Sequence, residues 1–174
     1  RVALASVCRK LLGDIGIHIA SRVVQIHDIV DSSSIPGNIK IQNLNELVDK
    51  SPVRCLNRKT EKEMIQVIDH AKSQGDSVGG IFEVIATGMP HGLGSYTQWN
   101  RKLQAKVASL MMSVNAYKAI EIGSGFNSGI KFGSEIHDEI EWNGKRYTRS
   151  SNNAGGIEGG MSNAMPITIR IAMK

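Results

Sequence analysis

One stretch whose residue types could bind an anion is residues 152–160. Its sequence is Asn-Asn-Ala-Gly-Gly-Ile-Glu-Gly-Gly. Because glycine has no side chain, its backbone N–H groups can approach an anion closely. The stretch matches neither the dinucleotide-binding fingerprint nor the phosphate-binding P-loop, since no Lys-Ser or Lys-Thr follows it and no strand directly precedes it. A binding loop and a flexible turn therefore both remain open.

A second stretch, Met112-Ser113-Val114-Asn115-Ala116, falls where an expected helix ends and an expected strand begins. The Asn115 amide offers both a donor and an acceptor, which suits the edge of a heterocycle. Asparagine is also common where helices end. On local grounds alone, Asn115 is better interpreted as a helix-terminating residue.

The histidines and cysteines do not indicate a metal or hydrolase site. The five histidines share no ligand spacing, and the acidic run at 134–139 has no nucleophile elbow to complete a hydrolase site. The two cysteines, Cys8 and Cys55, are too few for a disulfide scaffold. Cys8 lies in an apolar helical run and is expected to be a core thiol, and we expect a reducing, cytoplasmic location.

Charge and composition favour a small anionic partner over nucleic acid. The chain has 174 residues, a net charge of +5 and a pI of about 9.3. Its basic residues alternate with acids, as at 57–63, and aromatic residues make up only 5%. The chain therefore has no block of basic residues to bind a phosphate backbone, and it has too few aromatic residues to stack single-stranded bases.

Length and hydropathy fit one domain, residues 1–174, without a membrane partner. No apolar run approaches the roughly 18–20 residues that a membrane span needs. The first residues do not form a signal peptide. They begin without Met inside a helical pattern, so we expect the chain to be a segment of a longer protein.

The elements that must position these stretches combine helices with strands. Apolar periodicity predicts helices at 2–12, 44–48, from Thr60 to Gly75, and at 100–112, with Thr60 and Glu63 as a capping box. Predicted strands, rich in Ile and Val or alternating, are at 17–30, 78–86, 117–122 and 167–174.

A hairpin signal at 139–148 sets the expected strand direction. Two short arms flank Asn143-Gly144, which predicts a type I′ turn. Hairpins join antiparallel strands, and the predicted helices and strands do not alternate strictly in βαβ order along the chain. The sequence therefore predicts an α+β fold with antiparallel sheets.

Five motifs in one order and spacing make the whole chain resemble chorismate synthase. They are Gly-Asp-Ser-Val-Gly-Gly at 75–80, Gly-Leu-Gly at 92–94, Met-Ser-Val-Asn-Ala at 112–116, Glu-Ile-Gly-Ser-Gly-Phe at 121–126, and residues 152–165. The resemblance implies a β-α-β sandwich with helices between antiparallel sheets, usually assembled as a homotetramer.

The resemblance also implies an activity. The family converts 5-enolpyruvylshikimate 3-phosphate to chorismate and phosphate by anti-1,4-elimination, in the shikimate pathway to the aromatic amino acids. Reduced FMN is required although the reaction is redox-neutral, and NADPH reduces the flavin in some members.

Residue by residue, the resemblance places four positions at the flavin. Asn115 and Ala116 match the pair that contacts FMN, Gly159 matches a glycine of the flavin-contacting loop, and Lys174 matches the lysine that opens a loop closing over the flavin. None of the histidines here matches the family's two acid histidines, so no catalytic residue is assigned and the chain alone is expected to be inactive. The rival hypotheses are a stand-alone flavin- or phosphate-binding module and an oligomerisation domain, neither of them catalytic.

Overall fold

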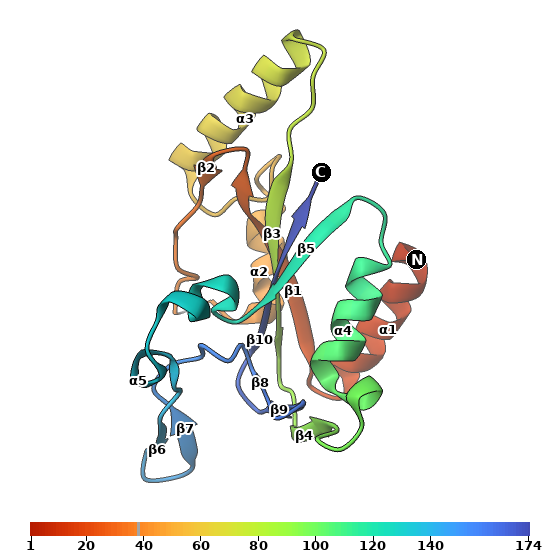
Figure 1. The fold of residues 1–174 in the computed structure, drawn as a ribbon. Coiled ribbons are helices and arrows are strands. Elements are labelled where there is room, and N and C mark those ends of the chain that lie inside the picture. Colours follow the sequence, from red (N-terminus) through yellow and green to blue (C-terminus); the bar gives the residue numbers. More distant parts are fainter. Residues whose placement is uncertain (38) are drawn as a thin grey trace.

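A five-stranded antiparallel sheet forms the centre of this computed structural model, which describes residues 1–37 and 39–174 (Figure 1). Its strands follow the order β2-β1-β3-β10-β5. Their bounds are β1 His18–Ile26, β2 Ile29–Val30, β3 Gly80–Thr87, β5 Tyr117–Ile122 and β10 Ile167–Met173. The predicted α+β fold with antiparallel pairing is confirmed.

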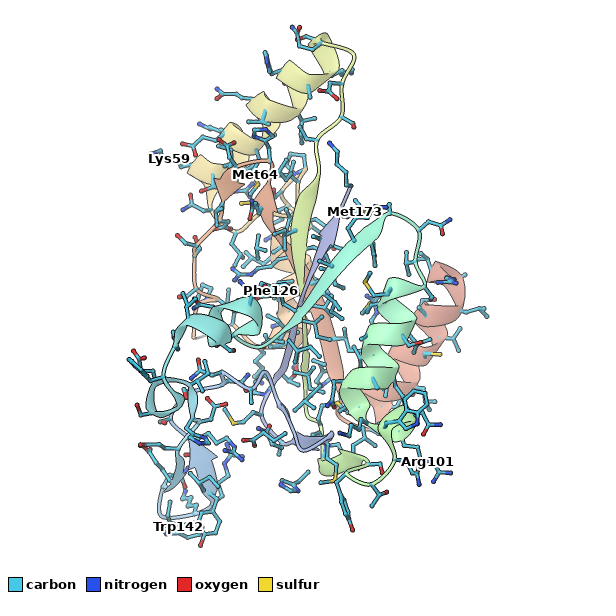
Figure 2. All side chains as sticks on the ribbon, in the orientation of Figure 1. Lys59, Met64, Arg101, Phe126, Trp142 and Met173 are labelled. Carbon is cyan, nitrogen blue, oxygen red and sulfur yellow. The ribbon has the colours of Figure 1, made fainter. Side chains whose placement is uncertain are left out.

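Helices and small hairpins surround this sheet. The helices are α1 Val2–Asp14, α2 Ile41–Val48, α3 Arg58–Ser73, α4 Leu103–Met112 and α5 Gly133–Ile136, with 3-10 turns η1 Trp99–Arg101 and η2 Gly125–Ile130. The remaining strands are β4 His91–Gly94, β6 Ile140–Trp142, β7 Tyr147–Arg149, β8 Ile157–Glu158 and β9 Met161–Asn163. They form a sheet of order β4-β9-β8 and the hairpin β6-β7, which lies away from the central sheet with Trp142 near its tip (Figures 1 and 2).

Two apolar clusters cover the two opposite faces of the central sheet. On one side α2 packs Leu44 and Val48 against Ala20 and Ile85. On the other, α4 packs against alternate residues of β10, namely Ile167, Ile169 and Ile171. Because side chains alternate along a strand, the half-buried pattern predicted for 167–174 is what a layered fold requires.

A row of charged residues crosses the sheet in register, on the same face as Ala20 and Ile85. Arg22 lies opposite Glu83, Glu83 opposite Arg170, and Arg170 opposite Glu121. The Arg22 Nε–Glu83 Oε2 and Arg170 NH2–Glu121 Oε2 distances are 2.9 and 3.0 Å. Opposite charges in cross-strand register stabilise strand pairing, so this row supports the pairing of β1, β3, β10 and β5 in the observed order.

Helix α1 differs from expectation because none of its residues is buried. Val2, Leu4, Val7 and Leu11 are between 65% and 87% exposed. Cys8, expected in the core, is exposed as well. Periodicity correctly predicted a helix with an apolar face, but no described residue covers that face.

Three local expectations are corrected. The predicted strand 17–30 is a hairpin, with His27 in its turn at φ 54°. Helix α3 begins at Arg58, two residues before Thr60, because the side chain of Asn57 accepts hydrogen bonds from the N–H groups of Lys59 and Thr60. The capping-box prediction at Thr60 and Glu63 is therefore wrong.

The hairpin between β6 and β7 forms, but its turn is centred one residue later than predicted. The Asn143 N–H donates to the Arg146 carbonyl, with an N–O distance of 3.2 Å, so Gly144 and Lys145 are the central residues. Only Gly144 has a positive φ, of 89°, so the turn is not type I′. The Asn143 side chain accepts from Lys145 N and Arg146 N and closes the turn.

Candidate functional site

Asn115 and Ala116 lie in the connection between α4 and β5, as the sequence predicted. Helix α4 ends at Met112, and Ser113 caps it while its hydroxyl donates to the Leu110 carbonyl. The left-handed residue is Ala116, with φ 71°, and not Asn115. The interpretation of Asn115 as the helix-terminating residue is therefore wrong.

This connection exposes two features that a ligand can use. The Asn115 side chain is exposed and has no hydrogen-bond partner among residues 1–37 and 39–174. Ala116 holds a backbone conformation that costs a non-glycine residue roughly 1 kcal/mol or more. Strained backbone and free polar groups are typical of binding sites, and here they lie next to each other.

Lys174 lies beside this connection because β10 runs between β5 and β3. Met173 pairs with Tyr117 on one side and with Gly80 on the other. One residue further, the Lys174 N–H donates to the Ala116 carbonyl with an N–O distance of 3.0 Å. The Lys174 Nζ donates to the Ser77 carbonyl at 2.8 Å.

The Lys174 ammonium group has no carboxylate within ion-pair distance in the described part of the chain. Its only protein partner there is a neutral carbonyl. The ammonium group therefore has no direct ion-pair partner there and can attract an anion such as a phosphate, although Asp28, Glu63 and Asp76 line the same pocket.

Gly159 lies at the other end of the molecule, in the turn between β8 and β9 (Figure 1). Gly159 and Gly160 have φ of 57° and 93° between the paired residues Glu158 and Met161. Positive φ at both central positions is what a type I′ turn demands, so glycine at 159 has a structural reason.

Helix α4 separates this glycine turn from Asn115. The Leu103 N–H donates to the Gly160 carbonyl at 2.8 Å, which fixes the turn at the first residue of α4. At about 1.5 Å per residue, the ten residues of α4 alone span roughly 15 Å. The structure thus brings Asn115, Ala116 and Lys174 together and leaves Gly159 apart, although the open space beside Gly159 leaves room for a ligand.

The loop at 151–154 is anchored by Asp138, whose importance the sequence did not reveal. Asp138 is 6% exposed. Its carboxylate accepts hydrogen bonds from Ser151 Oγ at 2.5 Å, Asn153 N at 2.6 Å and Ala154 N at 2.8 Å. Burial alone raises the pKa of Asp138, but these three donors and the nearby Arg149 charge outweigh it and hold the pKa below its ordinary value.

The glycines of the same loop are packed against protein. A Cβ on Gly155 would lie 2.3 Å from Gly123 N, and one on Gly156 would lie 2.6 Å from Pro166 O. The Asn152 amide donates to Pro166 O at 2.8 Å and accepts from Gly156 N at 2.9 Å. Residues 151–156 therefore form a packed structural element. In the 159–160 turn, Gly160 is packed as well, because a Cβ there would lie 2.3 Å from the Ser95 carbonyl oxygen, and only Gly159 is open to a ligand.

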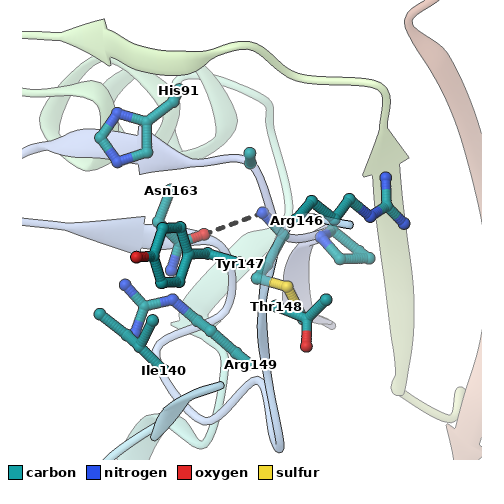
Figure 3. Close-up of a pocket in the computed structure, with 10 residues that line it drawn as sticks. His91, Ile140, Arg146, Tyr147, Thr148, Arg149 and Asn163 are labelled. Atoms are coloured by element: carbon teal, nitrogen blue, oxygen red, sulfur yellow. Dashed lines mark hydrogen bonds between the residues drawn. The ribbon is translucent and has the colours of Figure 1, made fainter. Parts of the chain in front are cut away.

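Two pockets of the described residues contain histidines, one of them two and the other one. One pocket of about 810 Å³ lies between β7 and the 163–166 segment and is lined by His91, Tyr147, Arg149 and Asn163 among others (Figure 3). A second, of about 680 Å³, lies between α3 and the β1–β2 turn and includes His27, His70 and Lys174.

Among residues 1–37 and 39–174, no group of three His, Cys, Asp or Glu could hold a metal ion. No helix of this part is long and apolar enough to cross a membrane.

Comparison with known proteins gives one consistent family. The family model for chorismate synthase matches residues 1–174. Chorismate synthase 2 of Bacillus cereus is 49% identical and chorismate synthase 1 of Bacillus anthracis is 48% identical, each over 100% of this chain. A crystal structure of chorismate synthase superposes with a TM-score of 0.90 at 44% identity.

These relatives are longer than the chain. It covers 44% of the Bacillus proteins, and 99% of its residues match 54% of the chain in the crystal structure. Because the family model spans the whole sequence and the fold agrees, the assignment does not depend on one motif. The chain belongs to the chorismate synthase family.

Proposed function

We propose that the full-length protein carrying this chain is a carbon–oxygen lyase that converts 5-enolpyruvylshikimate 3-phosphate to chorismate and phosphate. In this anti-1,4-elimination the ring C–O bond to phosphate breaks and the phosphate leaves with the electron pair. A ring C–H bond breaks, its proton is lost, and a second ring double bond forms. The balance needs no net oxidant or reductant.

The observation that carries the proposal is the convergence of Asn115, Ala116 and Lys174 at one end of β5 and β10 in a chain of this family. These residues fit a flavin phosphate or a substrate phosphate. The free Asn115 amide can pair with a heterocycle edge, and the unpaired Lys174 ammonium can bind an anionic group. Reduced FMN, when bound, supplies electron density while the phosphate leaves.

In this proposal the residues of this chain bind and orient the flavin and the substrate, and they do not transfer protons. Asn115 and Ala116 bind the flavin edge, Lys174 neutralises negative charge, and the turn at Gly159 contacts the ligand from the far end of α4. The proton donors of the reaction lie outside the 174 residues. General acid catalysis contributes about 10²–10⁴-fold, and correct placement of substrate adds more. The isolated chain should therefore show no turnover.

The same reasoning extends to the setting of the enzyme. We propose a homotetramer in the cytoplasm, with NADPH as the reductant of the flavin in the full-length protein. The exposed apolar face of α1 supports a further layer or subunit on this side of the molecule.

An anaerobic phosphate-release assay tests the proposal. Full-length protein with reduced FMN should release phosphate from 5-enolpyruvylshikimate 3-phosphate, and the same protein with oxidised FMN should not. A non-catalytic phosphate-binding module or an oligomerisation domain gives no release in either state, and a generic phosphate binder has no preference for reduced flavin.

The isolated 174-residue chain is the matched comparison in the same assay. It should release no phosphate even with excess reduced FMN. Turnover that follows this chain through gel filtration would mean that catalytic acids lie within residues 1–174, and His91 and His137 would be mutated first.

A further inference from the structure

The backbone at 77–79 meets Lys174 across the end of β3. Lys174 lies one residue beyond the Met173–Gly80 pair, so its backbone runs opposite Gly79. A Cβ on Gly79 would lie 2.7 Å from the Met173 carbonyl oxygen and 3.2 Å from Lys174 Cδ. The aliphatic part of the Lys174 side chain therefore passes over the bare Cα of Gly79 before Nζ reaches the Ser77 carbonyl.

Gly79 is not required by its own backbone conformation. Its φ lies outside the positive region that other residues avoid, unlike that of Gly75 at 66°. Its carbonyl accepts from His27 N at 3.0 Å, a bond that any residue type can make. The close approach of Met173 and Lys174 is what excludes a larger side chain.

We infer that Gly79 and the Ser77 carbonyl are positioning groups for the Lys174 side chain, which hold its ammonium group at a fixed place beside the 77–79 backbone at the end of β3. The inference rests on the proposed function, which places Lys174 at the flavin. The backbone bond from Lys174 N to Ala116 O holds one end of the residue, and the Ser77 carbonyl holds the other. A long, flexible side chain held at both ends loses less entropy when an anion binds.

The neighbouring Gly80 provides a matched control. A Cβ there would lie 2.7 Å from the Gln25 carbonyl oxygen on β1, the same separation as between Gly79 and Met173 O. Its clash is thus with the strand on the other side of β3, away from Lys174. Gly79→Ala and Gly80→Ala should destabilise the protein similarly, but only Gly79→Ala should displace the lysine.

Two readouts test the inference in the full-length protein. Anaerobic titration should show that Gly79→Ala weakens reduced-FMN binding roughly tenfold, while Gly80→Ala stays within about twofold of wild type. In a Lys174→Met background, Gly79→Ala should cause no further loss. Independently of flavin, acetylation of Lys174 by the amine-reactive reagent acetic anhydride, followed by peptide mass spectrometry, should be faster in Gly79→Ala than in wild type or Gly80→Ala.

The outcomes separate the inference from the function on which it rests. If Lys174→Met leaves the reduced-FMN Kd unchanged, Lys174 is not at the flavin, and both the placement and the inference fail. If Lys174→Met weakens binding but Gly79→Ala matches Gly80→Ala in affinity and in acetylation rate, the positioning of Lys174 by Gly79 and the Ser77 carbonyl is refuted, while the proposed function stands.

Discussion

Replacing Asp138 with Asn should destabilise the protein by about 3 kcal/mol near neutral pH. The Asn amide oxygen can still accept from Ser151 and Asn153, but its NH2 group would face the Ala154 N–H, which Asp138 Oδ2 now accepts at 2.8 Å. The change removes one hydrogen bond to a charged group, worth about 1.5–3 kcal/mol, and leaves a buried donor unpaired at about 1–3 kcal/mol.

The loss should depend on pH in a defined direction. The pKa of Asp138 is lower in the folded protein than its ordinary value, so the unfolded chain takes up this proton first as pH falls. The stabilisation from Asp138 is therefore complete above about pH 5 and is lost as pH falls below about 4 towards the folded-state pKa. The difference between wild type and Asp138→Asn should shrink over the same range.

Urea unfolding of full-length wild type, Asp138→Asn and Glu139→Gln from pH 7 to pH 3.5 measures both effects. Glu139 is an exposed neighbour, so Glu139→Gln removes the same charge without breaking these hydrogen bonds. It should change the free energy of unfolding by less than about 0.5 kcal/mol. A loss for Asp138→Asn no larger than that of Glu139→Gln, or one that does not vary with pH, would refute the assignment of Asp138 as the anchor.

Three further predictions concern the ligand and the thiols. In the full-length protein, Asn115→Leu should weaken reduced-FMN binding by about 1–3 kcal/mol in an anaerobic titration, and unchanged affinity would remove Asn115 from the site. Gly159→Val should abolish flavin binding, whereas Gly159→Asn, which tolerates positive φ, should keep the thermal midpoint and still bind flavin more weakly; full affinity in Gly159→Asn would mean that the glycine serves only the turn. Burial and the Asp31 carboxylate raise the pKa of Cys55 to about 12, so iodoacetamide at pH 8 should label the exposed Cys8 of the 174-residue chain and leave its Cys55 unmodified, as peptide mass spectrometry can check.

Elements with a strong local period could be predicted from the sequence. Helix α4, strand β5 and strand β10 form within a few residues of where apolar spacing placed them. Asn115 therefore lies at the predicted junction of helix and strand. Such patterns are local, because one face of the element must be apolar whatever its partner is.

Features that depend on distant residues could not be predicted. The charge row through Arg22, Glu83 and Arg170 depends on strand register, which local sequence does not specify. Asp138 anchors a loop 13 to 16 residues away, and nothing in the run around it distinguishes it from a surface acid. The apolar period of α1 predicted a buried face, but period cannot say whether the chain contains the partner that covers it.

The separation of Gly159 from Asn115 was missed for the same reason. The resemblance assigned each residue to the flavin without relating one position to another. The intervening α4 sets their distance, and the Leu103–Gly160 hydrogen bond that fixes it joins residues 57 positions apart. Only the fold relates them.

The position of β10 in the sheet also bears on synthesis by the ribosome. This strand lies between β3 and β5. Neither β3 nor β5 can therefore pair with β10 until residues 167–173 have emerged. At about 5–20 residues per second, translation from Thr87 to Met173 takes roughly 4–17 s. During that interval the edge of β3 that β10 will cover is unpaired, and β5 adds a second such edge once residues 117–122 have emerged. Unpaired strand edges can pair with other chains. Chaperone demand should therefore peak late in translation of this segment and fall once β10 inserts.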